Sequence, residues 1–303
     1  MKRVFLFLVL NFAVMLVMMA AFHVICALLG ISPQEAFARV GGGLDLKALA
    51  VFSLVFGMLG GFISLLMSKS IAKMSVGART VTGSEGPAER WLVDTVRMLA
   101  ERANLQMPEV AIYHGPANAF ATGAFRNHAL VAVSDSIMGQ MTREELRAVL
   151  GHEMSHVANG DMVTMTLLQG VLNACVIFLS RVVAALAVSA MQKEGSSRRR
   201  GGSSGIYYLV YYVMQILLGI LASIVAMWYS RRREYAADAG SAKLLGSPSA
   251  MIAALRRLGN LQPGVLPDSI KAFGISGGMR TLFSTHPALE DRIAALERLQ
   301  RGL

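Results

Sequence analysis

Four long apolar stretches constrain the fold of this 303-residue chain more than any other feature of its sequence. Each is long enough to cross a hydrocarbon core of about 30 Å as a helix, and they cover residues 5–30, 46–67, 162–190 and 206–229. Hydrophobic residues make up 54% of the chain and charged residues 16%, against about 25% charged residues in soluble domains. The sequence therefore predicts a mainly α integral membrane protein with four transmembrane helices.

The first stretch follows Met-Lys-Arg and could be taken for a secretory signal peptide. Its apolar core exceeds the about 7–15 residues of a signal core, so we expect a retained helix. With the second stretch it forms an N-terminal transmembrane hairpin over residues 1–69. The third and fourth stretches form a second apolar hairpin over residues 162–229, with a flexible basic loop at residues 191–205. Because Arg181 is costly in lipid, the alternative for this second hairpin is packing against the soluble part.

Basic residues beside the apolar stretches indicate the orientation of the chain. The net charge is +10, and these flanking residues lie on one side if four helices cross the membrane: Lys2, Arg3, Lys69, Lys73 and Arg231–Arg233. We expect that side to be cytoplasmic and to face anionic lipid, which favours the bilayer over nucleic acid as the partner of this charge. The loop at Arg198–Arg200 falls on the opposite side and conflicts with this rule.

Two segments of mixed charge, residues 70–161 and 230–303, are expected to fold on the cytoplasmic side. The first contains runs of strand composition bounded by turn residues, and the second has helical periodicity. The expected strands are residues 109–114 and 128–133, with 118–123 either a third strand or an extended loop, and the expected amphipathic helices are residues 250–258 and 289–299. The sequence thus predicts a small β-sheet in an α+β part, followed by a helical part.

An H-E-x-x-H motif, the shortest signature of zinc hydrolases, occurs at the end of the first of these segments. A capping box at Thr142-Arg-Glu-Glu145 predicts a helix over residues 143–159, which contains the motif. Residues four apart on a helix share a face, so His152 and His156 point both imidazoles into one site, as a zinc ion requires. Glu153 is then placed to take a proton from a water molecule at the metal.

A catalytic zinc needs a third protein ligand, and no histidine follows His156 at the spacing that metzincins use. The candidates are His114, His128, His286 and acidic residues downstream. Glu234 and Asp238 lie four residues apart directly after the fourth apolar stretch, where we expect a helix to begin. One of them can bind zinc while the other accepts the second N–H of a ligating histidine. Taken alone, the two acids would indicate only a solvated helix start beside an arginine run.

Four separated motifs can be compared with known families: H-E-x-x-H, Glu234-x-x-x-Asp238, Thr285-His286-Pro287 with Arg292, and Asn118-Ala-Phe-Ala-Thr-Gly123. Together they resemble the membrane zinc metallopeptidases related to the CAAX prenyl protease, in particular the bacterial HtpX branch, over essentially the whole chain. The resemblance implies a gluzincin-like core with one Zn²⁺ per chain. Its implied ligands are His152, His156 and Glu234, with Glu153 as the general base.

The resemblance also implies roles for further residues. His286 and Arg292 correspond to positions that contact the substrate backbone or the tetrahedral oxyanion, where a hydrogen-bond donor is stabilising. Asn118 is a candidate for holding a peptide by its backbone, beside a strand edge that could pair with an extended substrate. The implied activity is quality-control cleavage of damaged membrane proteins and unfolded polypeptides at the cytoplasmic face of the bacterial inner membrane. The prenyl protease itself has more transmembrane helices and a large chamber, for which this chain is too short.

The alternative function is a membrane zinc transporter or sensor that does not hydrolyse anything. Such a protein would need polar residues deep inside several spans, and apart from Asn173 and Arg181 these are scarce. It would also have no use for Glu153. The sequence therefore favours a zinc-dependent endopeptidase and leaves its oligomeric state open.

Overall fold

The computed structural model describes residues 27, 32, 46–194, 203–260 and 286–302, which belong to two compact units. The apolar unit comprises Met1–Ser64 with Thr166–Ala226, and the α+β unit comprises Leu65–Met165 with Met227–Leu303. The predicted transmembrane segment at residues 5–30 lies almost entirely outside the described residues, and so does the basic run Arg198–Arg200.

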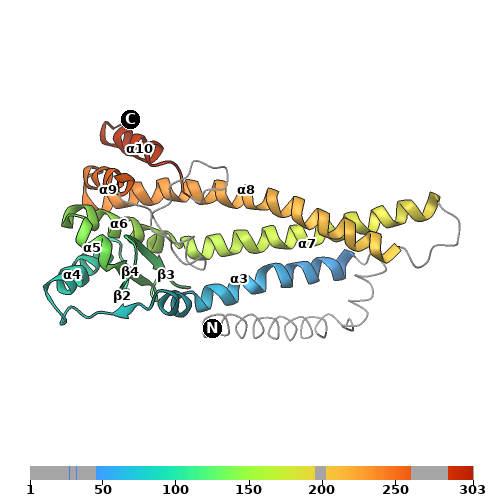
Figure 1. The fold of residues 1–303 in the computed structure, drawn as a ribbon, viewed down its shortest axis with the longest axis horizontal. Coiled ribbons are helices and arrows are strands. Elements are labelled where there is room, and N and C mark those ends of the chain that lie inside the picture. The colour runs from blue at the N-terminus through green and yellow to red at the C-terminus, as the bar shows by residue number, and fades with distance from the viewer. Residues whose placement is uncertain (1–26, 28–31, 33–45, 195–202, 261–285, 303) are drawn as a thin grey trace. The chain divides into compact units, whose positions relative to one another are not determined.

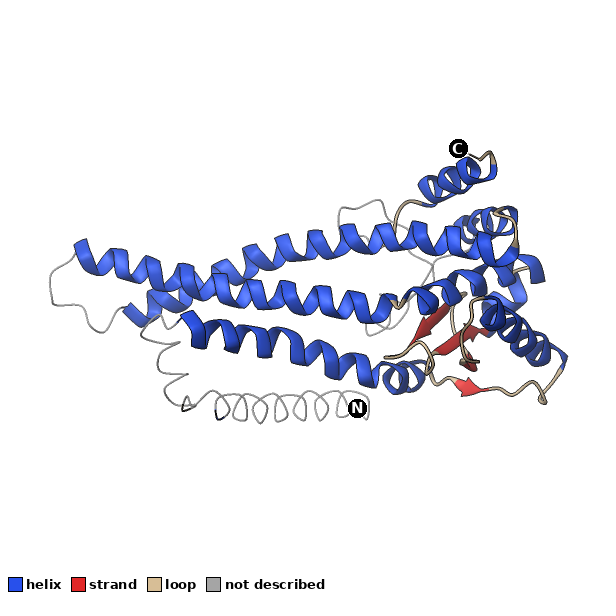
Figure 2. Cartoon of the chain, turned by 180° about the vertical axis from the view of Figure 1, so that it is seen from behind, coloured by secondary structure: helices blue, strands red, loops and turns tan. Residues whose placement is uncertain are grey.

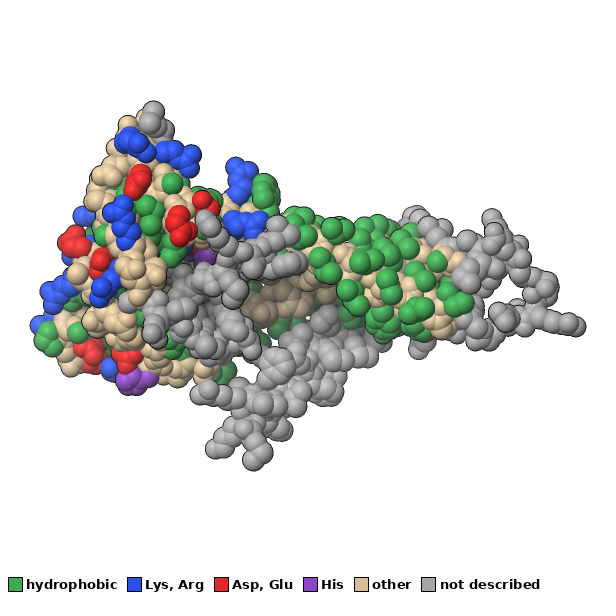
Figure 3. Space-filling model, turned by 45° about the horizontal axis from the view of Figure 1, so that its top comes forward, with side chains coloured by type: hydrophobic (Ala, Val, Ile, Leu, Met, Phe, Trp, Pro, Cys, Tyr) green, Lys and Arg blue, Asp and Glu red, His purple; other side chains and the backbone are tan. Residues whose placement is uncertain are grey.

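Three long helices correspond to the second, third and fourth apolar stretches (Figures 1 and 2). They are α3 (Leu46–Val76), α7 (Asp161–Glu194) and α8 (Ser203–Leu245), and each is long and apolar enough to cross a membrane. Hydrophobic side chains cover the long helices on the face shown in Figure 3. A helix satisfies its own backbone hydrogen bonds, as a lipid environment requires. Three apolar helices are therefore present in the described part of the chain, and the fourth predicted one falls outside it.

Helix α8 extends beyond the apolar stretch that the sequence predicts. The expectation of a new helix at Arg233 is wrong, because α8 continues without interruption through Glu234 and Asp238. No proline or glycine lies between the apolar stretch and Asp238, so nothing ends the helix there. It ends instead at Leu245, before Gly246, whose φ of 79° suits a left-handed helix terminus.

Within the apolar unit, α3 and α7 approach closely through small residues. A side chain at Gly57 would lie 2.5 Å from the backbone nitrogen of Ala174, so only glycine permits this contact. Arg181 of α7 stacks on Phe52 of α3 at 4.9 Å and on Tyr211 of α8 at 5.2 Å from the ring centroids. The arginine that is costly in lipid is thus held between the aromatic rings of two other helices.

The α+β unit contains a four-stranded mixed sheet with the order β1-β2-β4-β3. Its strands are β1 (Arg79–Thr80), β2 (Glu109–Tyr113), β3 (Ala119–Thr122) and β4 (Leu130–Ser134). Strands β2 and β4 run parallel, and β3 pairs antiparallel with β4, with Ala121 opposite Val131. The segment that the sequence left as strand or loop is therefore a strand, and it lies at the edge of the sheet.

Five helices complete the described part of the α+β unit: α4 (Pro87–Arg102), α5 (Asp135–Gln140), α6 (Arg143–Asn159), α9 (Ser249–Asn260) and α10 (Leu289–Gln300). The predicted helices at residues 143–159, 250–258 and 289–299 are confirmed, and the capping box of Thr142 and Glu145 is present. Helix α6 packs against β3, α4 and α9. Its apolar side chains, with Leu150 and Met154 fully buried, anchor the motif in the core.

The last turns of α3 are fixed to the sheet by charge. Glu109 of β2 pairs with Lys69 at 2.8 Å and with Lys73. Thr80 of β1 donates a hydrogen bond to the same carboxylate at 2.6 Å. The two lysines expected at the membrane surface therefore also bind the folded α+β unit.

Candidate metal centre

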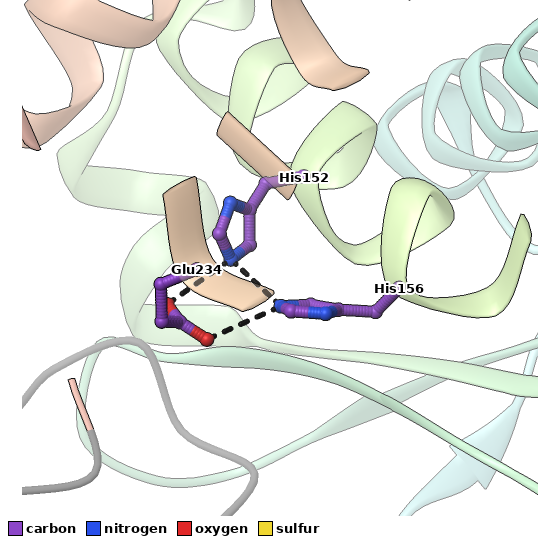
Figure 4. A group of neighbouring side chains, drawn as sticks. All are labelled: His152, His156 and Glu234. Carbon is purple, nitrogen blue, oxygen red and sulfur yellow. Dashed lines mark hydrogen bonds and ion pairs between the residues drawn. The ribbon is translucent and has the colours of Figure 1, made fainter. Parts of the chain in front are cut away.

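The H-E-x-x-H helix brings its two histidines to one point. The Nε2 atoms of His152 and His156 lie 3.1 Å apart, and both face Glu234 of α8 (Figure 4). The carboxylate oxygens of Glu234 lie 3.5 Å from Nε2 of His152 and 3.3 Å from Nε2 of His156. Among the described residues, these three side chains form a group that could hold a metal ion.

The spacing of this group suits a tetrahedral zinc ion. With bonds of about 2.0–2.1 Å, the ligand atoms of such an ion lie about 3.3–3.4 Å from one another. The two Nε2 atoms lie 3.1 Å apart, and the two oxygens of Glu234 lie 3.3 and 3.5 Å from them, so these distances are close to that value. Two imidazole nitrogens and a carboxylate oxygen also form a donor set that zinc accepts in catalytic sites. The residues present therefore fit the metal that the motif implies.

A buried carboxylate and a buried arginine stand behind His152. Nδ1 of His152 donates to Asp238 Oδ1 at 2.9 Å, which leaves the Nε2 lone pair directed at the ligand group. Arg292 of α10 donates to both oxygens of Asp238 and is 0% exposed. Burial alone would raise the pKa of Asp238, but the Arg292 guanidinium holds it below its usual value. Asp238 thus lies behind His152, in the position that the sequence expected one of the two acids to take.

Arg292 has surroundings that differ from those of an oxyanion donor. Its side chain is enclosed by the protein, with Nη1 3.4 Å from a Glu234 oxygen as well as the two bonds to Asp238. A group that contacts substrate needs a face toward the substrate, whereas this guanidinium donates its carboxylate hydrogen bonds to Asp238 and forms an ion pair with Glu234. Its geometry favours a positioning role.

His286 lies at the same centre, with Nδ1 2.8 Å from a Glu234 oxygen and a side chain 12% exposed. Burial opposes ionisation of Glu234, but His286 and the two motif histidines hold the pKa of this carboxyl well below its usual range. The other two histidine candidates lie elsewhere: His114 is almost fully exposed and pairs with Asp135, and His128 is exposed in the loop after β3. Neither belongs to the metal group.

Glu153 faces the edge strand of the sheet. Its Oε2 accepts a hydrogen bond from the backbone N–H of Ala121 at 2.7 Å, and its side chain is buried. Burial raises the pKa of Glu153 above its ordinary value, which makes the carboxylate a better proton acceptor near neutral pH. The structure therefore places this glutamate between the motif helix and strand β3.

Asn118 directly precedes the edge strand and is 1% exposed. Its backbone N–H donates to the Ser134 hydroxyl at 3.0 Å, and its carbonyl accepts from the Ser134 N–H at 2.9 Å. The backbone groups through which a peptide was expected to bind are therefore engaged inside the sheet.

Two residues of the centre were not found from the sequence. Nδ1 of His156 donates to Asp161 Oδ2 at 2.6 Å, and the other oxygen of Asp161 pairs with Arg233. Asp161 looks like an ordinary first residue of an apolar helix, and Arg233 like one member of a basic run. Their only sequence signal is position, since each lies within five residues of a metal-group residue.

Two histidines of an H-E-x-x-H helix, a glutamate from a second helix and a buried glutamate beside them define the site of a metallopeptidase. A comparison of the sequence with family models agrees: the model for Peptidase family M48 matches residues 87–300, and the chain belongs to this family. The resemblance drawn from the motifs is thus confirmed.

Full-length relatives extend this assignment. The chain is 53% identical to the "Protease HtpX homolog" of Verminephrobacter eiseniae over 297 residues, which covers 98% of both chains. It is 52% identical to the "Protease HtpX homolog" of Janthinobacterium sp. over 303 residues, or 99% of this chain and 100% of the relative. These relatives and the apolar helices make it a protease of a metallopeptidase family with membrane character.

The comparison with solved structures concerns the fold. The crystal structure of S. mikatae Ste24p superposes with a TM-score of 0.59 at 18% identity, covering 86% of this chain. The chain spans 64% of the length of that protein. At this identity the likeness concerns the fold alone.

Proposed function

We propose that this protein is a zinc-dependent endopeptidase that cleaves misfolded or damaged membrane proteins and unfolded polypeptides by activation of water. The observation that carries the proposal is the convergence of His152, His156 and Glu234 at the spacing of a tetrahedral ion, with Glu153 beside them. A transporter or sensor would not need a buried glutamate bonded to a sheet edge. The relatives of this chain are named as proteases, which also supports the proposal.

The residues divide the chemistry among them. When bound, zinc would polarise the peptide carbonyl and make a water molecule more acidic. The Glu153 carboxylate takes the proton of the attacking water and later delivers it to the leaving amine. His286, which is partly exposed at the centre, is assigned to donating a hydrogen bond to the oxygen that becomes negative. Arg292 is assigned to holding Asp238 and Glu234 in place.

Strand β3, whose residues are buried in this structure, is assigned to pair with the substrate main chain. It lies at the edge of the sheet, and the N–H of Ala121 points toward Glu153 rather than toward β4. An extended polypeptide can add to such an edge through its main chain, which requires little particular sequence. Asn118, which is buried directly before the strand, is assigned to help hold the main chain of that polypeptide.

Arg231–Arg233 directly precede Glu234 in the sequence, so the positive-inside rule assigns the metal site to the cytoplasmic side of the inner membrane. We retain the division into residues 1–69, 70–161, 162–229 and 230–303 as an N-terminal hairpin, a catalytic part, an apolar hairpin and a helical part with the third ligand.

The test is a Glu153→Gln variant of the full chain, purified in detergent, with Glu144→Gln as the matched control on the same helix. Glu144 is exposed and pairs with Arg147 of the same helix. The expected result is about one zinc per chain in all three proteins and loss of casein cleavage in Glu153→Gln alone. Undiminished cleavage by that variant would remove Glu153 from its role. A parent protein purified without metal would overturn the zinc site itself.

A further inference from the structure

Both histidines of the metal group have the same kind of support. Behind His152 stand Asp238 and then Arg292. Behind His156 stand Asp161, 2.6 Å from Nδ1, and then Arg233. The first chain of contacts contains the Asp that the E-x-x-x-D motif marks, whereas no motif marks the second.

We propose that Asp161 and Arg233 are positioning residues that fix His156 as a metal ligand and connect it to the beginning of α7 and to α8. The proposal rests on the zinc site described above. Neither residue touches the metal or the substrate. Asp161 acts through the His156 ring, and Arg233 acts through Asp161.

The hydrogen bond to Asp161 determines which nitrogen of His156 is available. An ionised carboxylate only accepts, so Nδ1 carries the proton and Nε2 presents its lone pair to the ligand group. The same bond holds the ring plane, so that Nε2 stays 3.3 Å from Glu234 and 3.1 Å from His152 Nε2. Without it, the ring could turn about its side-chain bonds, because His156 is more exposed than His152.

Arg233 stabilises the buried carboxylate of Asp161. The Asp161 side chain is 4% exposed, and a carboxylate in such surroundings needs a charge partner as well as a hydrogen bond. The Arg233 guanidinium, 17% exposed, supplies that charge at the oxygen that His156 does not use. Arg233 directly precedes Glu234 on α8, and Asp161 follows His156 by five residues. The contact between Arg233 and Asp161 therefore links the segments that carry these two metal-group residues.

The backbone between His156 and Asp161 is built for this contact. Helix α6 ends at Gly160, whose φ of 69° lies in the left-handed region that favours glycine. The chain turns there and starts α7 at Asp161. A carboxylate at the first turn of a helix would gain some stability from the helix dipole alone. The test must therefore separate a capping role from support of His156.

The experiment measures zinc affinity by chelator competition on full-length protein in detergent, together with the visible spectrum of the cobalt-substituted protein. Asp161→Ala is expected to weaken zinc binding about 10–100-fold and to change the cobalt spectrum at saturation. Arg233→Gln is expected to weaken it by a smaller factor, and Arg233→Lys to restore most of the loss. Arg232→Gln is the matched control, because Arg232 contacts Trp228 instead.

A double variant tests the order of action. If Arg233 acts through Asp161, zinc affinity in Asp161→Ala with Arg233→Gln equals that of Asp161→Ala alone. Fully additive losses would overturn that part of the proposal. A folded Asp161→Ala protein with parental zinc affinity and cobalt spectrum would overturn the whole of it; Asp161→Asn replaces it if the alanine variant does not fold. A parent protein without zinc would instead contradict the proposed function, so the two failures are distinguishable.

Discussion

The guanidinium of Arg292 holds both carboxylate oxygens of Asp238, with Nε 2.8 Å from Oδ2 and Nη2 2.6 Å from Oδ1. All of this lies inside the protein, since Arg292 is 0% exposed. Because Asp238 holds His152 in turn, an arginine 140 residues away in the sequence supports the first residue of the motif.

Arg292→Met should therefore damage the site rather than only the reaction. Removing Arg292 leaves the buried carboxylates of Asp238 and Glu234 without their positively charged partner, which costs about 3–5 kcal/mol of stability. We expect a lower melting temperature and loss of bound zinc, while Arg298→Met, on the exposed face of the same helix, changes neither. A variant with parental stability and zinc content but a reduced kcat would instead indicate an oxyanion role for Arg292.

Glu234→Ala should lose most of the metal affinity. The carboxylate is the only acidic member of the metal group and is ionised because the surrounding histidines stabilise its charge. Zinc content after dialysis against a weak chelator is the measurement, with Glu290→Ala, exposed at the start of α10, as the control. Retention of one zinc per chain by Glu234→Ala would assign the third ligand to another residue.

Zinc affinity should fall as the pH is lowered, beginning above pH 6.5. Burial opposes protonation of His152 and His156, but their acidic partners raise the pKa of both rings above the ordinary value of 6.5. Protons therefore compete with the metal for Nε2 as the pH falls through these raised values, and zinc binding releases protons. Chelator competition between pH 8.5 and 5.5 should give weaker binding at each lower step. Affinity that is constant across this range would contradict the assignment of these two ligands.

Glu109→Gln should destabilise the α+β unit at neutral pH and not in strong acid. Burial would raise the pKa of Glu109, but Lys69, Lys73 and Thr80 lower it to about 2. A lowered pKa means that the ion pairs stabilise the fold above pH 4.5 and that this contribution disappears as the pH falls toward 2. We expect a loss of about 1–2 kcal/mol at pH 7, reduced from the full shift by solvent screening.

Thermal melting in detergent at pH 7 and pH 3 measures this difference. The exposed Glu101→Gln is the control and should match the parent at both values. Equal destabilisation by Glu109→Gln at the two pH values would show that the lost contacts are not electrostatic.

Short-range patterns predicted much of the site. The capping box located α6, and the spacing of His152, Glu153 and His156 was sufficient to indicate the metal, because a helix fixes which side chains share a face. Glu234 and Asp238 were recognisable as a pair, but their roles came from the family resemblance. The structure gives Glu234 the distances of a ligand and Asp238 the bond to His152.

Contacts between residues far apart in the chain could not be predicted from the sequence. Arg292 lies in a short amphipathic helix, and an arginine there is ordinarily solvent-exposed, since burial of its charge depends on a partner 54 residues away. The pairing of Asp161 with Arg233 has the same origin, across the whole second apolar hairpin. The strand order β1-β2-β4-β3 likewise follows from contacts that no local pattern encodes.

The hydrogen bond from the Ala121 N–H connects the edge strand directly to Glu153, the proposed proton acceptor. A polypeptide that pairs with β3 through the same edge can shift along it only in steps of two residues, because the main-chain groups on one edge of a strand repeat with that period. The position of a bound chain is then counted in backbone units from the glutamate. An enzyme of this kind would cut an extended segment at the peptide bond held opposite Glu153, whichever side chains that segment carries.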